Sequence, residues 1–315
     1  MPIATLTLNP AIDVTYDIDR LIPDYKVHAA ATRYDPGGNG INVSRALKRL
    51  QVPARTFCVL AGETGLFLER LLQRHLDDPA YIRIAGETRI NCTLLEQASG
   101  SQYEVSGIGP HLGTDRLDDL LDTFVDYVGE GCGVVTGSVP PGVGPDVYAQ
   151  LVGRIRAQGG RPVLDAHGEL LRLGVQAHPF LVKPNRYELE QLVGRPLPDA
   201  DTVAGVLPQL KEYGINYWCV SLGGEGAVLF DGHRLWHARP PRVPVRSTVG
   251  AGDSMVAALV AGFAREMDTA EILRLAVACS AGTVMQPGTE LFDPERLPEL
   301  LQQVEVTVID KRTRR

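Results

Sequence analysis

Ser-Thr-Val-Gly-Ala-Gly-Asp-Ser-Met, residues 247–255, runs directly into the apolar segment Val-Ala-Ala-Leu-Val-Ala-Gly-Phe-Ala, residues 256–264. Small residues stand where a helix must begin, so the backbone can approach a ligand closely. The free N–H groups of the first turn and the positive end of the helix dipole favour an anion there. The stretch therefore predicts a phosphate site at the start of a helix.

Asp253 is unexpected at such a site, because a carboxylate beside phosphates is repelled. A carboxylate at this place can take the proton from an attacking hydroxyl group, while the backbone amides neutralise charge on a transferred group. The alternative is an ordinary helix N-cap with a glycine turn. This stretch alone leaves both interpretations open.

The composition is that of a globular protein: the 315 residues are 44% hydrophobic and 22% charged. A net charge of −7 argues against a general role at nucleic acids or membrane surfaces. The N-terminus lacks the features of a signal peptide, and no apolar run approaches the roughly 18 residues of a membrane span. We therefore expect a cytoplasmic protein. The five cysteines and seven histidines show no spacing typical of a disulfide framework or a metal site.

The order of predicted elements indicates an α/β fold. From about residue 117 onward, helices and short apolar strands alternate, which is typical of a doubly wound, mostly parallel sheet with helices on both faces. Two earlier strand pairs, within 13–34 and 89–107, do not fit this alternation. We expect them to leave the main sheet and form a small β-sheet lid. Residues 1–315 are expected to form a single domain, ending in a frayed basic tail at 311–315.

Residues 248–254, Thr-Val-Gly-Ala-Gly-Asp-Ser, resemble the C-terminal signature of the ribokinase-type, or PfkB, carbohydrate kinases. Six elements occur in the order of that family between about residues 9 and 290. The resemblance implies a ribokinase-like fold that uses ATP and Mg²⁺. It also implies that Asp253 is the catalytic base and that the amides of Gly250, Ala251 and Gly252 form the anion hole.

The residues implied to bind a sugar phosphate lie in the first half of the chain. Gly-Gly-Asn-Gly-Ile-Asn-Val, residues 37–43, resembles the N-terminal signature, and Thr-Arg-Ile-Asn, residues 88–91, resembles the phosphosugar branch, in which the arginine meets the substrate phosphate. The implied set is Asp13, Lys26, Gly37, Gly38, Asn42, Arg89 and Ser138. For Lys26 a solvated surface position is an equal alternative. A glycine turn with an N-capping amide is the alternative for residues 37–43.

The residues implied to bind the nucleotide lie in the second half. Lys-Pro-Asn-Arg-Tyr-Glu, residues 183–188, and Ser-Leu-Gly-Gly-Glu-Gly-Ala, residues 221–227, match two nucleotide elements of the family. These imply contacts from Lys183, Asn185, Ser221, Gly223, Gly226, Thr248 and Met255, with Glu188 organising a hydrated Mg²⁺. Residues 286–289 fall where the family closes the adenine pocket. The alternatives are a capped helix start for Asn185 and Glu188 and core packing for Met255.

The resemblance favours fructose 6-phosphate as substrate and keeps fructose 1-phosphate and tagatose 6-phosphate as alternatives. Asn39 stands where the 1-phosphofructokinase pattern usually has lysine and the 6-phosphofructokinase pattern glycine. A non-catalytic sensor of sugar phosphates or nucleotides would not need Asp253, Asn185 and Glu188, and a Rossmann dehydrogenase would need an early GxGxxG motif. The exposed strand edges of the lid predict a homodimer formed through lid-to-lid contacts.

Overall fold

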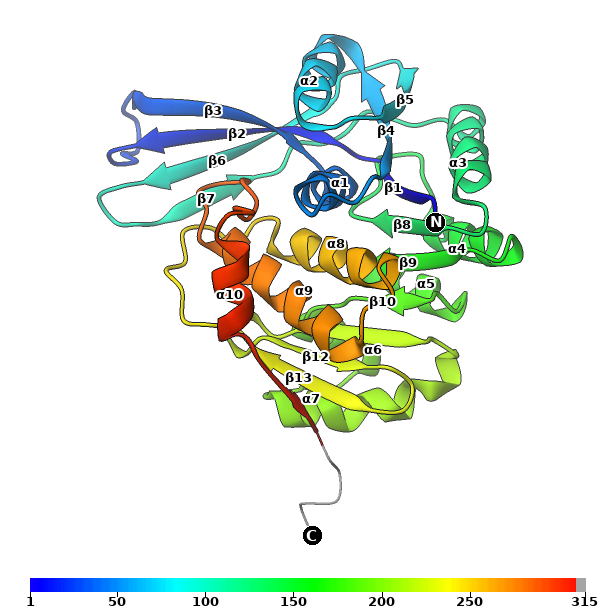
Figure 1. Ribbon diagram of the computed structural model, residues 1–315. Coiled ribbons are helices and arrows are strands. Elements are labelled where there is room, and N and C mark those ends of the chain that lie inside the picture. Colours follow the sequence, from blue (N-terminus) through cyan, green and yellow to red (C-terminus); the bar gives the residue numbers. More distant parts are fainter. Residues whose placement is uncertain (310–315) are drawn as a thin grey trace.

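The computed structural model describes residues 1–309, and a sheet of ten strands forms their centre (Figure 1). Its neighbours from β5 to β11 run parallel, and β12, β13 and β14 continue it in antiparallel pairs. This confirms the predicted α/β fold with a mostly parallel sheet. In sheet order, the strands are β14 (Glu305–Val308), β13 (Leu235–Arg239), β12 (Ala227–Phe230), β11 (Tyr217–Ser221), β10 (Leu181–Val182), β9 (Arg161–Asp165), β8 (Cys132–Thr136), β1 (Ile3–Thr7), β4 (Arg55–Ala61) and β5 (Pro79–Ile84).

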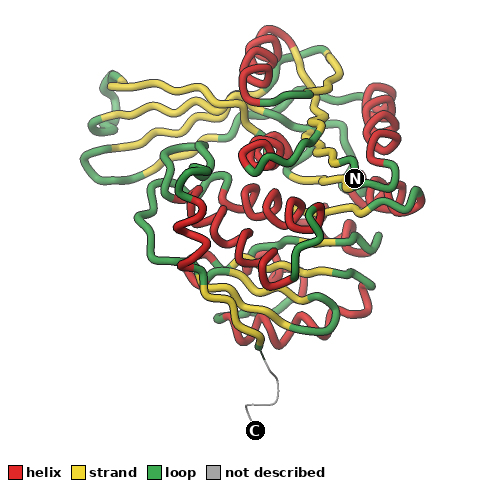
Figure 2. Tube along the Cα trace, in the orientation of Figure 1, coloured by secondary structure: helices red, strands yellow, loops and turns green. Residues whose placement is uncertain are grey.

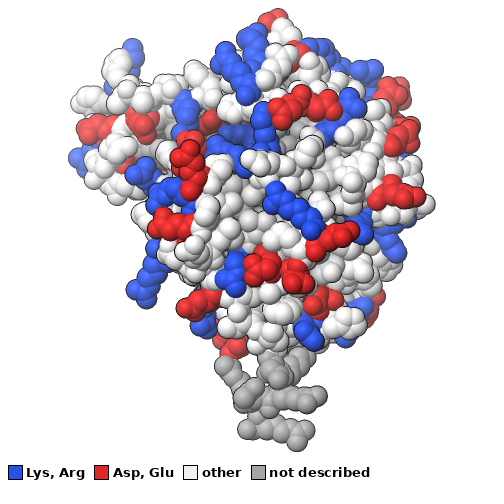
Figure 3. Space-filling model, viewed as in Figure 1, with Lys and Arg blue, Asp and Glu red and all other residues white. Residues whose placement is uncertain are grey.

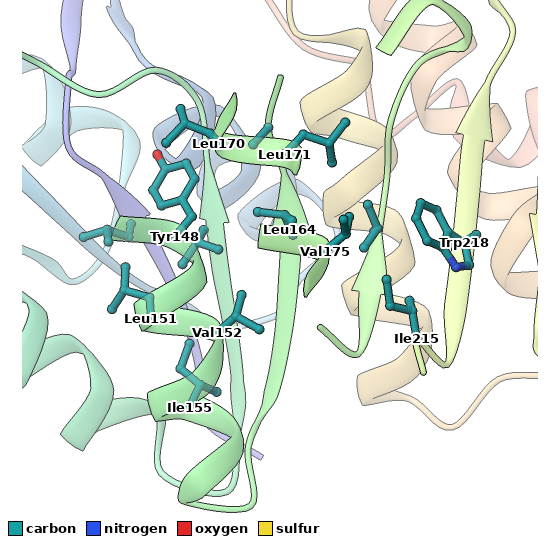
Figure 4. Packing of buried hydrophobic residues seen from close by; sticks show 14 of the residues in the cluster. Tyr148, Leu151, Val152, Ile155, Leu164, Leu170, Leu171, Val175, Ile215 and Trp218 are labelled. Carbon is teal, nitrogen blue, oxygen red and sulfur yellow. The ribbon is translucent and has the colours of Figure 1, made fainter. Parts of the chain in front are cut away.

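Helices cover both faces of the sheet because successive strand residues point to opposite sides. Val134 packs into one apolar cluster with α1 (Asn39–Arg49), α8 (Ala251–Ala264), α9 (Thr269–Val284) and α10 (Leu297–Gln303). Val135 packs into the other, shown in part in Figure 4, with α3 (Thr114–Val128), α4 (Val147–Ala157), α5 (Gly168–Gln176), α6 (Arg186–Val193) and α7 (Ala200–Val206). The sheet is thus buried on both sides, as a parallel sheet requires.

The predicted lid is a separate sheet with the strand order β3-β2-β6-β7, and Figure 2 shows it projecting away from the helices of the body. Its strands are β2 (Ala11–Ile18), β3 (Ala29–Gly37), β6 (Arg89–Glu96) and β7 (Gln102–Val105). The register places Asp13 between Asp35 and Asn91. Helix α2 (Gly62–His75) supports the lid, with Phe67 stacked edge-on against Tyr34 at 5.4 Å. Segments far apart in the chain therefore meet beside the main sheet.

Helix α7 is followed directly by a 3₁₀ turn over Leu207–Tyr213. Pro208 stands at the start of that turn and has no N–H group to continue the α-helical ladder. Within residues 1–309, no helix has the length and apolar character needed to cross a membrane. Acidic and basic side chains alternate over the face shown in Figure 3. The predicted basic tail at 311–315 lies outside the described residues.

Candidate active site

Helix α8 begins at a glycine turn between two cavities. Gly250 adopts a φ of 77°, a left-handed conformation that glycine tolerates, and the helix follows from Ala251. Gly250 lines a polar cavity, whereas Ala251 and Gly252 line an apolar one. The amides of this first turn therefore lie at the boundary of both cavities, where an anion shared between two ligands would sit.

The polar cavity has a volume of about 370 Å³ and lies between the two sheets. Most of its side chains can donate or accept hydrogen bonds, as a site for a hydroxylated ligand needs. Seven of the residues implied to bind substrate or to act in catalysis meet here: Asp13, Gly38, Asn42, Arg89, Ser138, Gly250 and Asp253. Residues for which the resemblance implies no role also line it, and these are Asn91, Ser106, Gly137, Asp165, Ala166, His167 and Val249.

The apolar cavity has a volume of about 420 Å³ on the other side of α8. Its walls come from the turn after β11, the segment 240–245 and the facing sides of α8 and α9. Five of the residues implied to bind nucleotide line it: Ser221, Gly223, Gly226, Thr248 and Met255. Apolar walls with a few polar groups suit a flat heterocyclic base.

Asp253 is buried, and both of its carboxylate oxygens accept hydrogen bonds from α1. The Nδ2 atoms of Asn39 and Asn42 each lie 2.9 Å from one of these oxygens. Burial, together with the charge of Asp165, raises the pKa of Asp253 to about 6, although the two amides and Lys183 act in the opposite direction. A carboxylate with this pKa is ionised at neutral pH and still basic enough to accept a proton from a hydroxyl group.

Lys183 follows β10 and forms a buried ion pair with Asp165 at 3.1 Å. Burial alone would lower the pKa of Lys183, but Asp165 and Glu188 raise it above its ordinary value. A Cβ placed on Gly252 would lie 3.4 Å from the Lys183 ammonium, so this cation sits beneath the start of α8. Lys183 therefore adds positive charge to the anion site from below.

Asn185 and Glu188 form a reciprocal capping box at the start of α6. The Asn185 side chain accepts from the Glu188 N–H at 2.8 Å, and Oε2 of Glu188 accepts from the Asn185 N–H at 2.7 Å. Among residues 1–309, no hydrogen bond reaches Oε1 of Glu188, and this side chain lines the polar cavity. Burial raises the pKa of Glu188. Asn185 itself lines neither cavity.

Arg89 extends from the start of β6 into the polar cavity. Its Nε and Nη2 atoms donate to the carbonyl of Asn9 at 3.1 and 2.8 Å, and Nη2 lies 3.5 Å from the Ser138 hydroxyl. Burial lowers the pKa of Arg89, which Asp13 partly opposes. A guanidinium bound only to neutral oxygens keeps much of its charge available for an anionic ligand.

The glycine pair before α1 permits close packing where the lid meets the body. Gly38 has a φ of 123° and lines the polar cavity. Any side chain on Gly37 would collide with the carboxylate of Asp13. Asp13 accepts from Asn91 at 2.8 Å, and burial raises its pKa. Gly37 thus shapes the site through Asp13, without lining the cavity itself.

The structure does not bring every implied residue to the cavities. Lys26 lies in the exposed turn between β2 and β3 and lines neither of them. The segment 286–289 contacts the lid, where the carbonyl of Pro287 accepts from Arg33 at 2.7 Å and Thr289 donates to Asp35 at 2.9 Å. These two contacts join the lid to the loop after α9, and the segment lines neither cavity.

A doubly wound sheet that presents a buried carboxylate at an anion-binding helix start, between a polar and an apolar cavity, defines a phosphotransferase. The chain belongs to the pfkB family of carbohydrate kinases, whose family model matches residues 6–296. It is 33% identical to the 1-phosphofructokinase of Bacillus subtilis over 95% of this chain and 98% of that relative. It is 34% identical to the ATP-dependent 6-phosphofructokinase isozyme 2 of Escherichia coli, with 92% and 94% covered.

Among solved structures, the chain resembles phosphofructokinase-2 from Escherichia coli in complex with substrates and products. The TM-score is 0.92 at 32% sequence identity, and the match covers 96% of this chain and 99% of that one. The likeness therefore extends over both the main sheet and the lid.

Proposed function

We propose that this kinase transfers a phosphoryl group from ATP to a hydroxyl of a fructose phosphate, with fructose 6-phosphate as the preferred acceptor. The observation that carries the proposal is that one polar cavity holds both Asp253 and Arg89. A base and a phosphate-binding cation in the same cavity suit a substrate with a reacting hydroxyl and a phosphate of its own.

In this proposal Asp253 takes the proton of the attacking hydroxyl. The amides of Gly250, Ala251 and Gly252 stabilise the charge on the phosphoryl group as it moves across the start of α8. Arg89 and Ser138 hold the phosphate of the acceptor. Asp13, Asn42 and the glycine pair bind its hydroxyl groups, and a contribution from Lys26 stays a prediction because it lies outside the cavity.

ATP is proposed to place its base in the apolar cavity beside Met255 and its phosphates over Lys183. Mg²⁺ would be held through water by Glu188, whose Oε1 is left unpaired by the capping box. Within residues 1–309 there is no cluster of three acidic, histidine or cysteine side chains that could enclose a metal. This donor set fits Mg²⁺, which keeps several waters and binds through one or two carboxylates and the substrate phosphates. When bound, the ion supplies charge neutralisation at those phosphates.

Phosphorylation of fructose 1-phosphate is the second candidate, because a relative named 1-phosphofructokinase is 33% identical to this chain and the 6-phosphofructokinase isozyme 34%. Asn39 fits neither pattern, since it is neither the lysine of one nor the glycine of the other. Tagatose 6-phosphate stays a third acceptor.

Initial rates of ADP release with MgATP and each sugar phosphate, compared as kcat/KM, discriminate among the three acceptors. We expect fructose 6-phosphate to give the highest ratio; a higher ratio for either rival would reassign the substrate, and no turnover with any would favour a sensor.

We also propose that the protein is a cytoplasmic homodimer assembled through the lid. The composition supports the location, and the exposed apolar side chains of the lid sheet support the assembly.

A further inference from the structure

Arg45 is a buried arginine on α1 that no step of the proposed reaction uses. Its guanidinium binds three neutral oxygens through Nη1: the side-chain oxygen of Asn42 at 3.0 Å, the carbonyl of Thr289 at 3.4 Å and that of Pro36 at 3.5 Å. Burial lowers the pKa of Arg45, and the carboxylates of Asp35, Asp13 and Glu290 oppose this effect. A charged side chain is seldom kept at such depth without a function for its donors.

The contact with Asn42 matters because an amide has two different ends. Arginine is a donor only, so the end of Asn42 that faces Arg45 must be its oxygen. The other end, Nδ2, then faces Asp253 and donates to Oδ2 at 2.9 Å. If the amide turned over, its oxygen would face the carboxylate and would repel the ionised form. Within residues 1–309, Arg45 is the only hydrogen-bond donor to Asn42 Oδ1. No other partner of this oxygen therefore holds the amide in its present orientation.

We propose that Arg45 is a positioning residue for the catalytic base: it fixes the amide of Asn42 so that the amide N–H donates to Asp253. This inference rests on the proposed function for the role of Asp253 as base. Arg45 acts through Asn42 and does not line the polar cavity. The same guanidinium binds Pro36 in lid strand β3, immediately before the glycine pair, and Thr289 in the loop after α9. The orientation of the Asn42 amide therefore depends on the packing of β3 and of the loop after α9 around Arg45.

Other charges around Asp253 stay in place when Arg45 is replaced. The charge of Asp165 raises the pKa of Asp253, and the charge of Lys183 lowers it. Asp13, Arg89, His167 and Glu188 line the same cavity. Any change in titration then comes from Asn42 or from loss of the Arg45 charge itself, and a second substitution at Asn42 separates these two causes.

The test is the titration of Asp253, followed by ¹³C NMR of protein labelled at the aspartate carboxyl groups, with Asp253→Asn to assign its signal. Removing the donor lets the Asn42 amide rotate, so Arg45→Met should raise the titration midpoint of Asp253 by about one pH unit. In assays this would appear as about a fivefold loss of kcat/KM at pH 6, because the ionised fraction of Asp253 would fall from about one half to about one eleventh, with recovery by pH 8. Arg45→Lys keeps the charge but cannot reach three oxygens at once, and it should shift the midpoint in the same direction.

Arg49→Met is the matched control. Arg49 lies one turn further along α1 and also donates to carbonyls of the loop after α9, those of Leu291 and Phe292. Among residues 1–309, its side chain makes no hydrogen bond to Asn42. It should lower stability without moving the Asp253 midpoint. An unchanged midpoint in a folded Arg45→Met or Arg45→Lys variant would overturn the proposal.

The double variant Asn42→Ala/Arg45→Lys separates an effect through the amide from any other. If Arg45 acts through Asn42, the second substitution should add no shift to Asn42→Ala alone; a shift as large as in the wild-type background would overturn the proposal. Failure of the proposed function would appear differently, as absence of turnover in the wild-type protein. The NMR titration reports on Arg45 in either case.

Discussion

As the proposed base, Asp253 has to meet two requirements: its carboxylate must be ionised before the reaction and must hold a proton after it. Burial beside Asp165 raises its pKa to about 6, and the amides of Asn39 and Asn42 limit that rise. The pH profile of kcat/KM should therefore fall on the acidic side with a midpoint of about 6. Asp253→Asn should lower kcat by about 10²- to 10⁴-fold, the usual contribution of a general base.

The Asp253→Asn variant should leave the KM for ATP nearly unchanged, since Asp253 does not line the apolar cavity. Steady-state rates across pH 5 to 9 measure both quantities. Near-normal turnover, or loss of ATP binding in proportion to kcat, would remove the assignment of Asp253 as base.

Asn39 tunes the same carboxylate from the other side. Its Nδ2 donates to Oδ1 of Asp253, and this hydrogen bond lowers the carboxylate pKa. Asn39→Gly removes the donor, so the acidic limb of the pH profile should move to higher pH. Asn39→Lys places a cation beside the carboxylate, which stabilises its ionised form and should move the limb to lower pH.

The ratio of kcat/KM for fructose 1-phosphate to that for fructose 6-phosphate, measured in the same Asn39 variants, tests whether this position also selects the acceptor. We expect the lysine variant to raise it. If the acidic limbs of the pH profiles of Asn39→Gly and Asn39→Lys moved in the same direction, or did not move, Asn39 would have no influence on the pKa of Asp253.

The carboxylate proposed as base and the glycine turn could be singled out from the sequence because their chemistry lies in one short stretch. Asp165 and Arg45 could not, since their contacts depend on the folded arrangement: Asp165 pairs with Lys183, and Arg45 binds Asn42 and the carbonyls of Pro36 and Thr289. Asn185 shows why a motif does not define a contact, because its side chain caps α6. The sequence pattern around Asn185 predicted the start of a helix, and it did not show whether the side chain reaches a ligand.

At the scale of elements, the turn after β11 lines the apolar cavity and lies close to the backbone of β13. Gly226 has a φ of 90°, and a Cβ there would collide with the carbonyl oxygen of Ala238. Gly226→Ala must therefore displace β12 from β13 beside the cavity. We expect the KM for ATP to rise by about tenfold or more, while the KM for the sugar phosphate changes little.

Gly194→Ala is the control for the Gly226 variant. Gly194 also has a left-handed φ, 68°, but a Cβ there meets nothing within 4 Å. The substitution should cost about 1 kcal/mol of unfolding free energy through backbone strain and leave both KM values unchanged. Equal effects of the two substitutions on the KM for ATP would show that the close approach at Gly226 does not shape the cavity.

The alternation of strands and helices was sufficient to predict the main sheet and the departure of the lid strands. The antiparallel edge β12 to β14 was not predicted, because β14 joins it from the far end of the described chain and pairs with β13 across some 65 residues. Helix α5, which has 9 residues, was not predicted either. Elements of that length carry too few residues for a period to be recognised.

For the molecule as a whole, the two faces of the lid sheet have different roles. Asn91 on β6 points toward Asp13, so the alternate residues Ile90, Cys92 and Leu94 occupy the opposite face. Tyr103 and Val105 of β7 pair with Leu94 and Cys92 and share that face. Ile90 is 47% exposed, Tyr103 42% and Val105 65%. An apolar sheet face open to solvent is typical of a surface that pairs with another chain.

If two copies pair through this face, light scattering at micromolar concentration should give about twice the chain mass of 34.1 kDa. Val105→Glu places a charge in the contact and should yield monomers. Because Val105 is exposed within one chain, the free energy of unfolding of that chain should change by less than about 0.5 kcal/mol. Glu104→Gln alters the neighbouring residue, whose side chain lies on the other face of β7, and should leave the dimer intact. A wild-type monomer, or a Val105→Glu dimer, would show that the lid face does not join two subunits and serves the active site of its own chain alone.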